Sequence, residues 1–174
     1  SEMMKQTDFI ARLELVYPYL ANELSVTCAI DSENLLAVLQ RMGLIQLAEQ
    51  DIVLPPLGTA TRRNLSHLSK LVNETLQRMF IVIDLAMQKR LNLTDLARQS
   101  QLAGQKLSML FGINAPEFAD QNLFNLFIDQ LIKQNMLAVG DDRTLVPSKV
   151  IKDVFQAAEH VIDPEVRLAL QSDP

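Results

Sequence analysis

Hydrophobic side chains recur every three or four residues along most of this chain, which is the spacing of one face of an α-helix. The longest run goes from about Thr61 to Lys89, where one stripe consists of Leu65, Leu68, Val72, Leu76, Met79, Ile83 and Met87. This pattern predicts a single long helix that joins two halves of the molecule.

Earlier in the chain, two shorter apolar patterns predict two further helices. The first pattern is Phe9, Leu13, Val16 and Leu20, and the second is Leu35, Leu36, Leu39 and Met42. Pro18 is expected to bend or restart the first helix, because proline lacks the amide proton that a helix interior needs. Asp31 or Ser32 is expected to cap the second helix, and Gly43 to end it.

After the long helix, Thr94 is expected to cap a short helix, and a turn at residues 102–104 to lead into another that ends at Gly112. Residues 120–134 are predicted to be helical again. Ser148 is expected to cap a last long helix, which Pro164 interrupts.

Two pairs of short apolar runs, each with a polar turn between them, predict β-hairpins. The pairs are residues 44–47 with 52–54, and residues 136–139 with 144–146. Each hairpin follows a helix, as the wing does in a winged-helix unit. We therefore expect a mainly α fold of two winged-helix-like helical units with short β-hairpins, bridged by a long central helix. The units are expected at residues 1–57 and 91–174, and the bridging helix at residues 58–90.

Composition narrows the class of protein. The chain has 174 residues, of which 48% are apolar, and this is too many for a disordered chain. The longest purely apolar run, Met79–Ile83, is far too short to span a membrane, and the N-terminus shows no signal peptide. The single cysteine, Cys28, excludes an internal disulfide and is interpreted as a small buried residue. These features predict a soluble, intracellular, globular chain.

Charge is distributed unevenly along the chain, although the net value is −5. Residues 61–106 carry eight basic and three acidic side chains, whereas both flanking segments are acidic. Such a segment could face an anionic partner, such as a lipid surface or an acyl carrier protein. The favoured alternative is that the three segments neutralise one another in the folded chain.

Two motifs look like functional sites, and neither is assigned a function. Residues 92–111 resemble a helix-turn-helix in which 104–111 would be the recognition helix. The expected wing tip carries Asp141 and Asp142, which repel phosphates, so nucleic-acid binding is disfavoured.

The two histidines are the other candidates. His67 is expected on the surface of the long helix, and His160, five residues before Glu165, is interpreted as a chance spacing. Two distant histidines and one cysteine cannot form a zinc site, so no catalytic, metal or cofactor-binding residue is predicted. Arg78 is a charge among apolar neighbours, and we expect it to pair with Glu74 or with a group on another segment.

The stretch Lys106–Asp120, KLSMLFGINAPEFAD, resembles a segment from the C-terminal region of bacterial membrane-bound glycerol-3-phosphate acyltransferases. Its apolar residues 107, 110 and 113 predict a helix face that ends near the glycine. Three other stretches resemble the same region in the same order: 74–78, 129–136 and 165–172. The likeness is good over roughly residues 70–174 and loose over the first sixty.

The resemblance implies a parent enzyme that transfers an acyl chain from acyl carrier protein or coenzyme A to the sn-1 hydroxyl of glycerol 3-phosphate. This reaction begins phospholipid synthesis at the cytoplasmic face of the inner membrane. The family's catalytic signature, a histidine followed five positions later by an aspartate, lies upstream of this region. The resemblance therefore implies a non-catalytic C-terminal module whose partner is the upstream catalytic domain. Acyl carrier protein or the membrane surface is a further expected partner, through residues 61–106. The alternative is a stand-alone winged-helix regulator or adaptor.

The sequence departs from the family pattern at three positions. Phe111 stands where a histidine is usual, Ala119 replaces an aromatic residue, and Lys106 replaces an arginine. Changes of this kind suit a packing role and would be surprising in a catalytic one. The stretch is therefore expected to be a structural joint.

Overall fold

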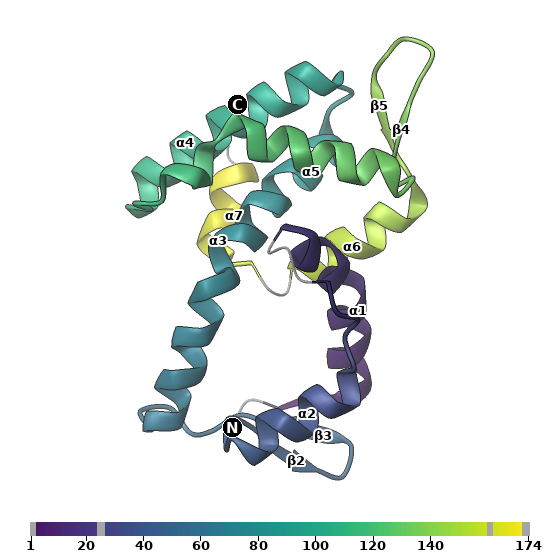
Figure 1. Ribbon diagram of the computed structural model, residues 1–174. Helices are drawn as coiled ribbons and strands as arrows, with labels where there is room; N and C mark the ends of the chain where they lie inside the picture. The colour runs from purple at the N-terminus through teal and green to yellow at the C-terminus, as the bar shows by residue number, and fades with distance from the viewer. Residues whose placement is uncertain (1–2, 24–26, 160–161, 172–174) are drawn as a thin grey trace. The chain divides into compact units, whose positions relative to one another are not determined.

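The computed structural model describes residues 3–23, 27–159 and 162–171, and these are mainly helical with small antiparallel sheets (Figure 1). The mainly α fold class is confirmed, while the winged-helix-like character of the units stays a prediction. The chain divides into two compact units, Ser1–Val72 and Asn73–Pro174. The domain boundaries expected at residues 57 and 90 likewise stay predictions.

The first unit contains a small antiparallel sheet and two helices that precede its hairpin. Its elements are β1 (Met3–Lys5), α1 (Gln6–Glu23), α2 (Ser32–Arg41), β2 (Gln46–Ala48) and β3 (Asp51–Val53). The expected hairpin is present as β2 and β3. The strand order is β1-β3-β2, and Met4 and Leu47 both lie opposite Ile52. The pairing of β1 with β3 is supported by an ion pair of 2.9 Å between Lys5 Nζ and Asp51 Oδ1.

The core of this unit forms where α2 packs against the sheet. Leu36, Ile45 and Ile52 are buried together, and the partly buried side chains around them are Phe9, Ile10, Leu39, Leu47 and Leu54. Leu36 and Leu39, two of the apolar positions that predicted α2, thus pack against the hairpin, whereas Met42 is 63% exposed.

The structure of this unit tests three expectations, which concern Pro18, the cap of α2 and Cys28. Helix α1 continues through Pro18 without restarting. Asp31 caps α2, with its Oδ1 accepting a hydrogen bond from the Asn34 amide at 3.0 Å, whereas Ser32 is buried. Cys28 is exposed, so the expectation that it is buried was wrong. It lies in the loop between α1 and α2, where Tyr17 Oη donates to its carbonyl at 2.9 Å.

The long helix α3 (Ala60–Gln88) is confirmed close to its expected limits. Thr59 caps it, since its Oγ1 accepts a hydrogen bond from the Arg62 amide at 3.2 Å. The predicted stripe is buried only in part: Leu68 is 46% exposed, whereas every residue from 77 to 84 is buried. The second half of α3 is therefore a core helix of the second unit, surrounded on all sides. Among the described residues, no helix is both long and apolar enough to cross a membrane.

The second unit is built around α4 and α5, which pack against each other (Figure 1). The elements of this unit after α3 are α4 (Leu93–Phe111), η1 (Pro116–Ala119), α5 (Gln121–Lys133), β4 (Leu137–Val139), β5 (Leu145–Pro147), α6 (Lys149–Glu159) and α7 (Pro164–Gln171). The expected hairpin is confirmed as β4 and β5. The Leu145 amide donates to the Leu91 carbonyl at 2.8 Å, which ties the hairpin to the chain before α4.

Residues 93–111 form one helix, so the two short helices expected there were wrong. Gly104 lies in the middle of α4 and is buried. A Cβ atom at this position would come within 3.3 Å of both the Phe118 carbonyl oxygen and Phe124 Cζ. The glycine therefore allows η1 and α5 to pack closely on the helix and makes no turn. A separate recognition helix at 104–111 does not exist.

Two expected helix caps are also corrected. Asn92, and not Thr94, caps α4, since the Asn92 side chain accepts a hydrogen bond from the Asp95 amide at 2.8 Å. The hydroxyl of Ser148 is buried without a hydrogen-bond partner, so Ser148 does not cap α6. The expected end of α4 at Gly112 is confirmed, with the glycine at φ +64°.

Candidate functional site

Arg78 joins the second half of α3 to the segment that resembles the acyltransferase family. Its side chain is only 4% exposed, and its Nη1 donates to the Glu117 carbonyl in η1 at 3.2 Å. The expectation of a partner on another segment is thereby confirmed. Burial lowers the pKa of the Arg78 guanidinium, and the nearby carboxylates of Glu117 and Asp120 oppose that shift. The arginine holds η1 against the core of the second unit.

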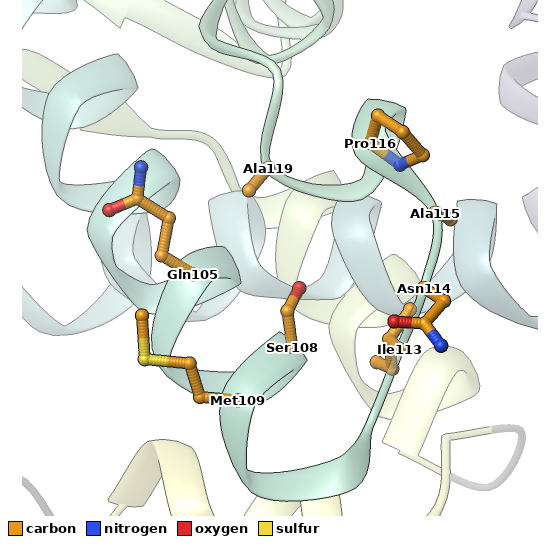
Figure 2. Close-up of a pocket in the computed structure, with 8 residues that line it drawn as sticks. All are labelled: Gln105, Ser108, Met109, Ile113, Asn114, Ala115, Pro116 and Ala119. Carbon is orange, nitrogen blue, oxygen red and sulfur yellow. The ribbon is translucent and has the colours of Figure 1, made fainter.

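The end of α4 and the chain that follows it enclose a groove of about 530 Å³ (Figure 2). It is lined by Gln105, Ser108 and Met109 from α4, by residues 113–116, and by Ala119 from η1. Gly112 makes the groove possible, because its left-handed backbone turns the chain back along the helix. None of the lining side chains is ionisable. The groove therefore offers amide, hydroxyl and apolar groups that suit binding, and no acid or base.

Apolar side chains at the end of α4 project away from the core of the second unit. Met109 is 84% exposed, Leu110 59% and Phe111 37%. Three consecutive residues spread over about 200° of a helix, so they cannot share one buried face. Leu107 packs inward, whereas Leu110, which belongs to the same apolar spacing, is exposed.

The three family departures fall on this same region. Lys106 and Phe111 are exposed, and Ala119 is half-buried and lines the groove. The size of the residue at position 119 therefore sets how wide the groove is. Gln105 and Ser108 also line it, although the sequence pattern did not single them out. The consecutive apolar residues 109–111 were the signal that this helix end has an exposed apolar side.

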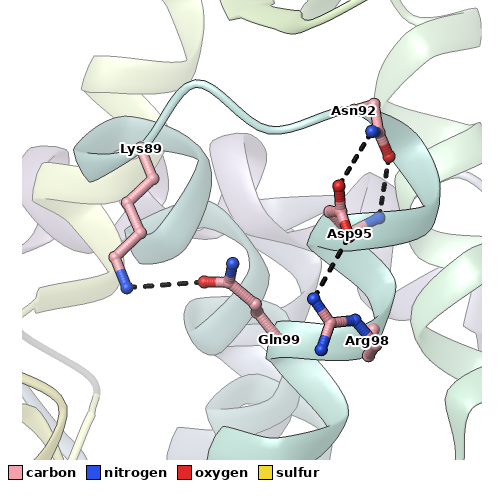
Figure 3. A network of polar contacts seen from close by, with 5 residues as sticks. All are labelled: Lys89, Asn92, Asp95, Arg98 and Gln99. Atoms are coloured by element: carbon pink, nitrogen blue, oxygen red, sulfur yellow. Dashed lines mark hydrogen bonds and ion pairs between the residues drawn. The ribbon is translucent and has the colours of Figure 1, made fainter.

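A polar network surrounds the start of α4 (Figure 3). Asn92 Nδ2 donates to Asp95 Oδ2 at 2.8 Å, and Arg98 Nη2 lies 3.2 Å from Asp95 Oδ1. One turn further on, Lys89 Nζ donates to Gln99 Oε1 at 3.4 Å. Both carboxylate oxygens of Asp95 thus have partners at the start of the helix, so this network has a structural role.

A cavity of about 810 Å³ lies between the start of α4 and the hairpin. Asp142 lines it and accepts hydrogen bonds from the Thr144 hydroxyl at 2.6 Å and the Thr144 amide at 3.0 Å. These bonds lower the pKa of Asp142. The carboxylate is therefore held ionised as part of the hairpin turn.

His67 is exposed on the first half of α3, as expected, and His160 lies outside the described residues. Within the described ranges, no group of three histidine, cysteine, aspartate or glutamate side chains is placed to hold a metal ion.

The exposed face of α5, the helix that precedes the hairpin, carries Asn122, Leu126, Asp129 and Lys133. A DNA-reading helix needs several cations near the phosphates, and here one lysine is offset by an aspartate. The exposed groups of α5 therefore do not suit a DNA backbone.

Comparison with known proteins identifies the region directly. The family described as "Glycerol-3-phosphate acyltransferase C-terminal region" matches residues 1–140. The glycerol-3-phosphate acyltransferase of Pseudomonas fluorescens strain SBW25 is 28% identical over 98% of this chain and 22% of its own length. The proteins of the same name from Pseudomonas paraeruginosa and Ectopseudomonas mendocina are 30% identical over 90% of this chain and 20% of theirs. No solved structure matches the chain significantly.

These matches confirm the resemblance that residues 106–120 carried. They also show that the family match includes the first sixty residues, where the sequence resemblance is loose. The chain spans about a fifth of the length of the relatives that it matches. It belongs to the family of glycerol-3-phosphate acyltransferase C-terminal regions.

Proposed function

We propose that this chain is a non-catalytic C-terminal module of a longer glycerol-3-phosphate 1-O-acyltransferase. In this proposal, another part of the same polypeptide transfers the acyl chain from its thioester donor to glycerol 3-phosphate. The observation that carries the proposal is the family match over residues 1–140, together with relatives five times as long as this chain.

The groove at the end of α4 supports a non-catalytic role. Acyl transfer to a hydroxyl needs a base that takes the hydroxyl proton as the oxygen attacks. Ser108 brings a hydroxyl to the groove, but no basic or acidic side chain lines it. The site has the composition of a packing or binding surface.

The basic segment 61–106 fits a membrane or acyl carrier protein less well than its sequence suggested. Arg78 is buried and bonded to η1, so it is not available to an external partner. Arg98 and Lys89 are engaged with Asp95 and Gln99. We therefore place contact with the catalytic part of the polypeptide first among the proposed partners. A location at the cytoplasmic face of the inner membrane is proposed only for the longer enzyme, and not for this chain by itself.

An assay of the purified chain tests this proposal. The chain is incubated with acyl-coenzyme A and labelled glycerol 3-phosphate, and lysophosphatidic acid is measured, with a full-length relative as the positive control. We expect no product above the protein-free background. Turnover by the chain alone that disappears in the His160→Ala variant would overturn the proposal.

A further inference from the structure

The end of α4 presents an apolar surface that no described residue of the second unit covers. We call it the α4 docking surface: Leu102, Met109, Leu110 and Phe111, together with the groove of Figure 2. Leu102 is 53% exposed and lies on the same helix, two turns before Met109. Single exposed apolar residues are ordinary in proteins, but Met109 and Leu110 are strongly exposed neighbours and Met109 lines a groove, which is the pattern of an interaction site.

The backbone beneath this surface is held rigidly. Gly104 brings η1 and α5 into close contact with α4, and Arg78 fixes the carbonyl of Glu117. Phe118, between these two anchors, is completely buried. A preformed surface loses little conformational entropy when a partner binds, so this rigidity favours binding.

The chemistry of the surface restricts the partner. No ionisable side chain lines the groove, and Lys106 is the one charged residue between Leu102 and Phe111. An acidic carrier protein or an anionic bilayer is recognised by clustered cations. The cores of stable protein interfaces are instead poor in charge and rich in apolar and methionine side chains.

We infer that the α4 docking surface binds an apolar segment from the remaining four-fifths of the acyltransferase polypeptide. This inference rests on the proposed function, because it takes its partner from the longer protein. It adds the residues through which the module is attached: Met109 at the centre, with Leu110 and the groove beside it.

Hydrogen–deuterium exchange tests the inference on the isolated chain and on the full-length acyltransferase that contains it. We expect amides of residues 102–119 to exchange about tenfold or more slowly in the full-length protein than in the isolated chain. The Met109→Glu variant should remove this protection in the full-length protein. Leu126→Glu, a matched change at an exposed leucine of α5, should leave it intact.

Two controls make other occupants visible. Neither variant should alter the Tm of the isolated chain, because both side chains are exposed; a lower Tm for Met109→Glu alone would mean that the isolated chain itself covers the surface. Vesicles of phosphatidylglycerol are added to the isolated chain in a parallel arm. Equal exchange in both proteins, or protection that arises only with vesicles, would overturn the inference. Hydrogen–deuterium exchange and Tm do not measure acyl transfer, so this inference can fail while the proposed function stands, and the reverse.

Discussion

Gly104 shows how one residue sets the packing of the second unit. Alanine at this position gains about 1 kcal/mol of helix propensity. Its methyl group would nevertheless press on the Phe118 carbonyl and on the buried ring of Phe124. Because overpacking of this kind costs about 1–3 kcal/mol, we expect Gly104→Ala to lower the free energy of unfolding by up to about 2 kcal/mol net.

Urea unfolding measures this effect, and Gln105→Ala provides the control. Gln105 is exposed on the neighbouring position of the same helix, so its replacement should change the free energy of unfolding by less than about 0.5 kcal/mol. A Gly104→Ala protein more stable than the parent would show that η1 and α5 are not tightly packed on α4.

Arg78 provides the second test at this scale. We expect Arg78→Ala to lower the free energy of unfolding by about 1–3 kcal/mol, because both the packing of its stem and its bond to Glu117 are lost. Arg98→Ala, which breaks an exposed pair with Asp95, should cost less than about 0.5 kcal/mol. Equal losses in the two variants, measured by denaturant unfolding, would contradict the role assigned to Arg78.

Some residue roles were readable in the sequence and others were not. Gly43 and Gly112 were recognised as helix ends because each follows an apolar helical pattern. In the structure both have the positive φ of such an end. Gly104 was misread as a turn. A glycine inside a helix looks the same in sequence whether it breaks the helix or admits a close neighbour. Its neighbours, Phe118 and Phe124, are fourteen and twenty residues away.

The start of α4 gives a test at the scale of one element. Removal of the Asn92 side chain leaves the Asp95 amide without its acceptor, so Asn92→Ala should lower the free energy of unfolding by about 1 kcal/mol. Thr94→Ala is the matched control, since Thr94 has the residue type of a cap but lies within the helix. Thermal unfolding should rank Asn92→Ala clearly below Thr94→Ala. The reverse order would restore Thr94 as the cap.

The hairpin of β4 and β5 has a built-in pH dependence at Asp142. Hydrogen bonds from Thr144 lower the pKa of this carboxyl in the folded chain. The carboxylate therefore stabilises the hairpin fully above its unfolded-state pKa, and this contribution is lost as the pH falls through the folded-state pKa.

An NMR titration of the Asp142 carboxyl measures the shift. Thr144→Val removes the hydroxyl donor, so the pKa of Asp142 should rise towards its ordinary value. Thr144→Ser keeps a hydroxyl and should keep the pKa low. An unchanged pKa in the valine variant would show that the hydroxyl is not the cause.

At the scale of elements, the period of the apolar pattern located α1, α2, α3 and α5, because burying one face needs that period whatever the packing partner. It divided α4 into two helices and missed η1. The strand β1 was missed. It has only three residues, and it exists because it pairs with β3, nearly fifty residues later. Such pairing leaves no local signal.

For the whole molecule, the family was readable from residues 106–120, whereas the groove that they form was not. A sequence motif can be recognised from the residue types at successive positions, without knowledge of the tertiary structure. Which side of α4 stays exposed depends on η1 and α5 packing against the other side. The exposed set at 102 and 109–111 is therefore a product of tertiary structure, and it is the feature that gives the module a surface for its partner.

The central claim is that this region contributes structure, and no catalytic group, to the acyltransferase. The most direct test is the kcat of the full-length enzyme that contains it, with both histidines of the region, His67 and His160, replaced by alanine. We expect a kcat within about twofold of the parent, because loss of a general base would lower it by about 100-fold or more. A fall of that larger size, in a protein that remains folded by circular dichroism, would contradict it.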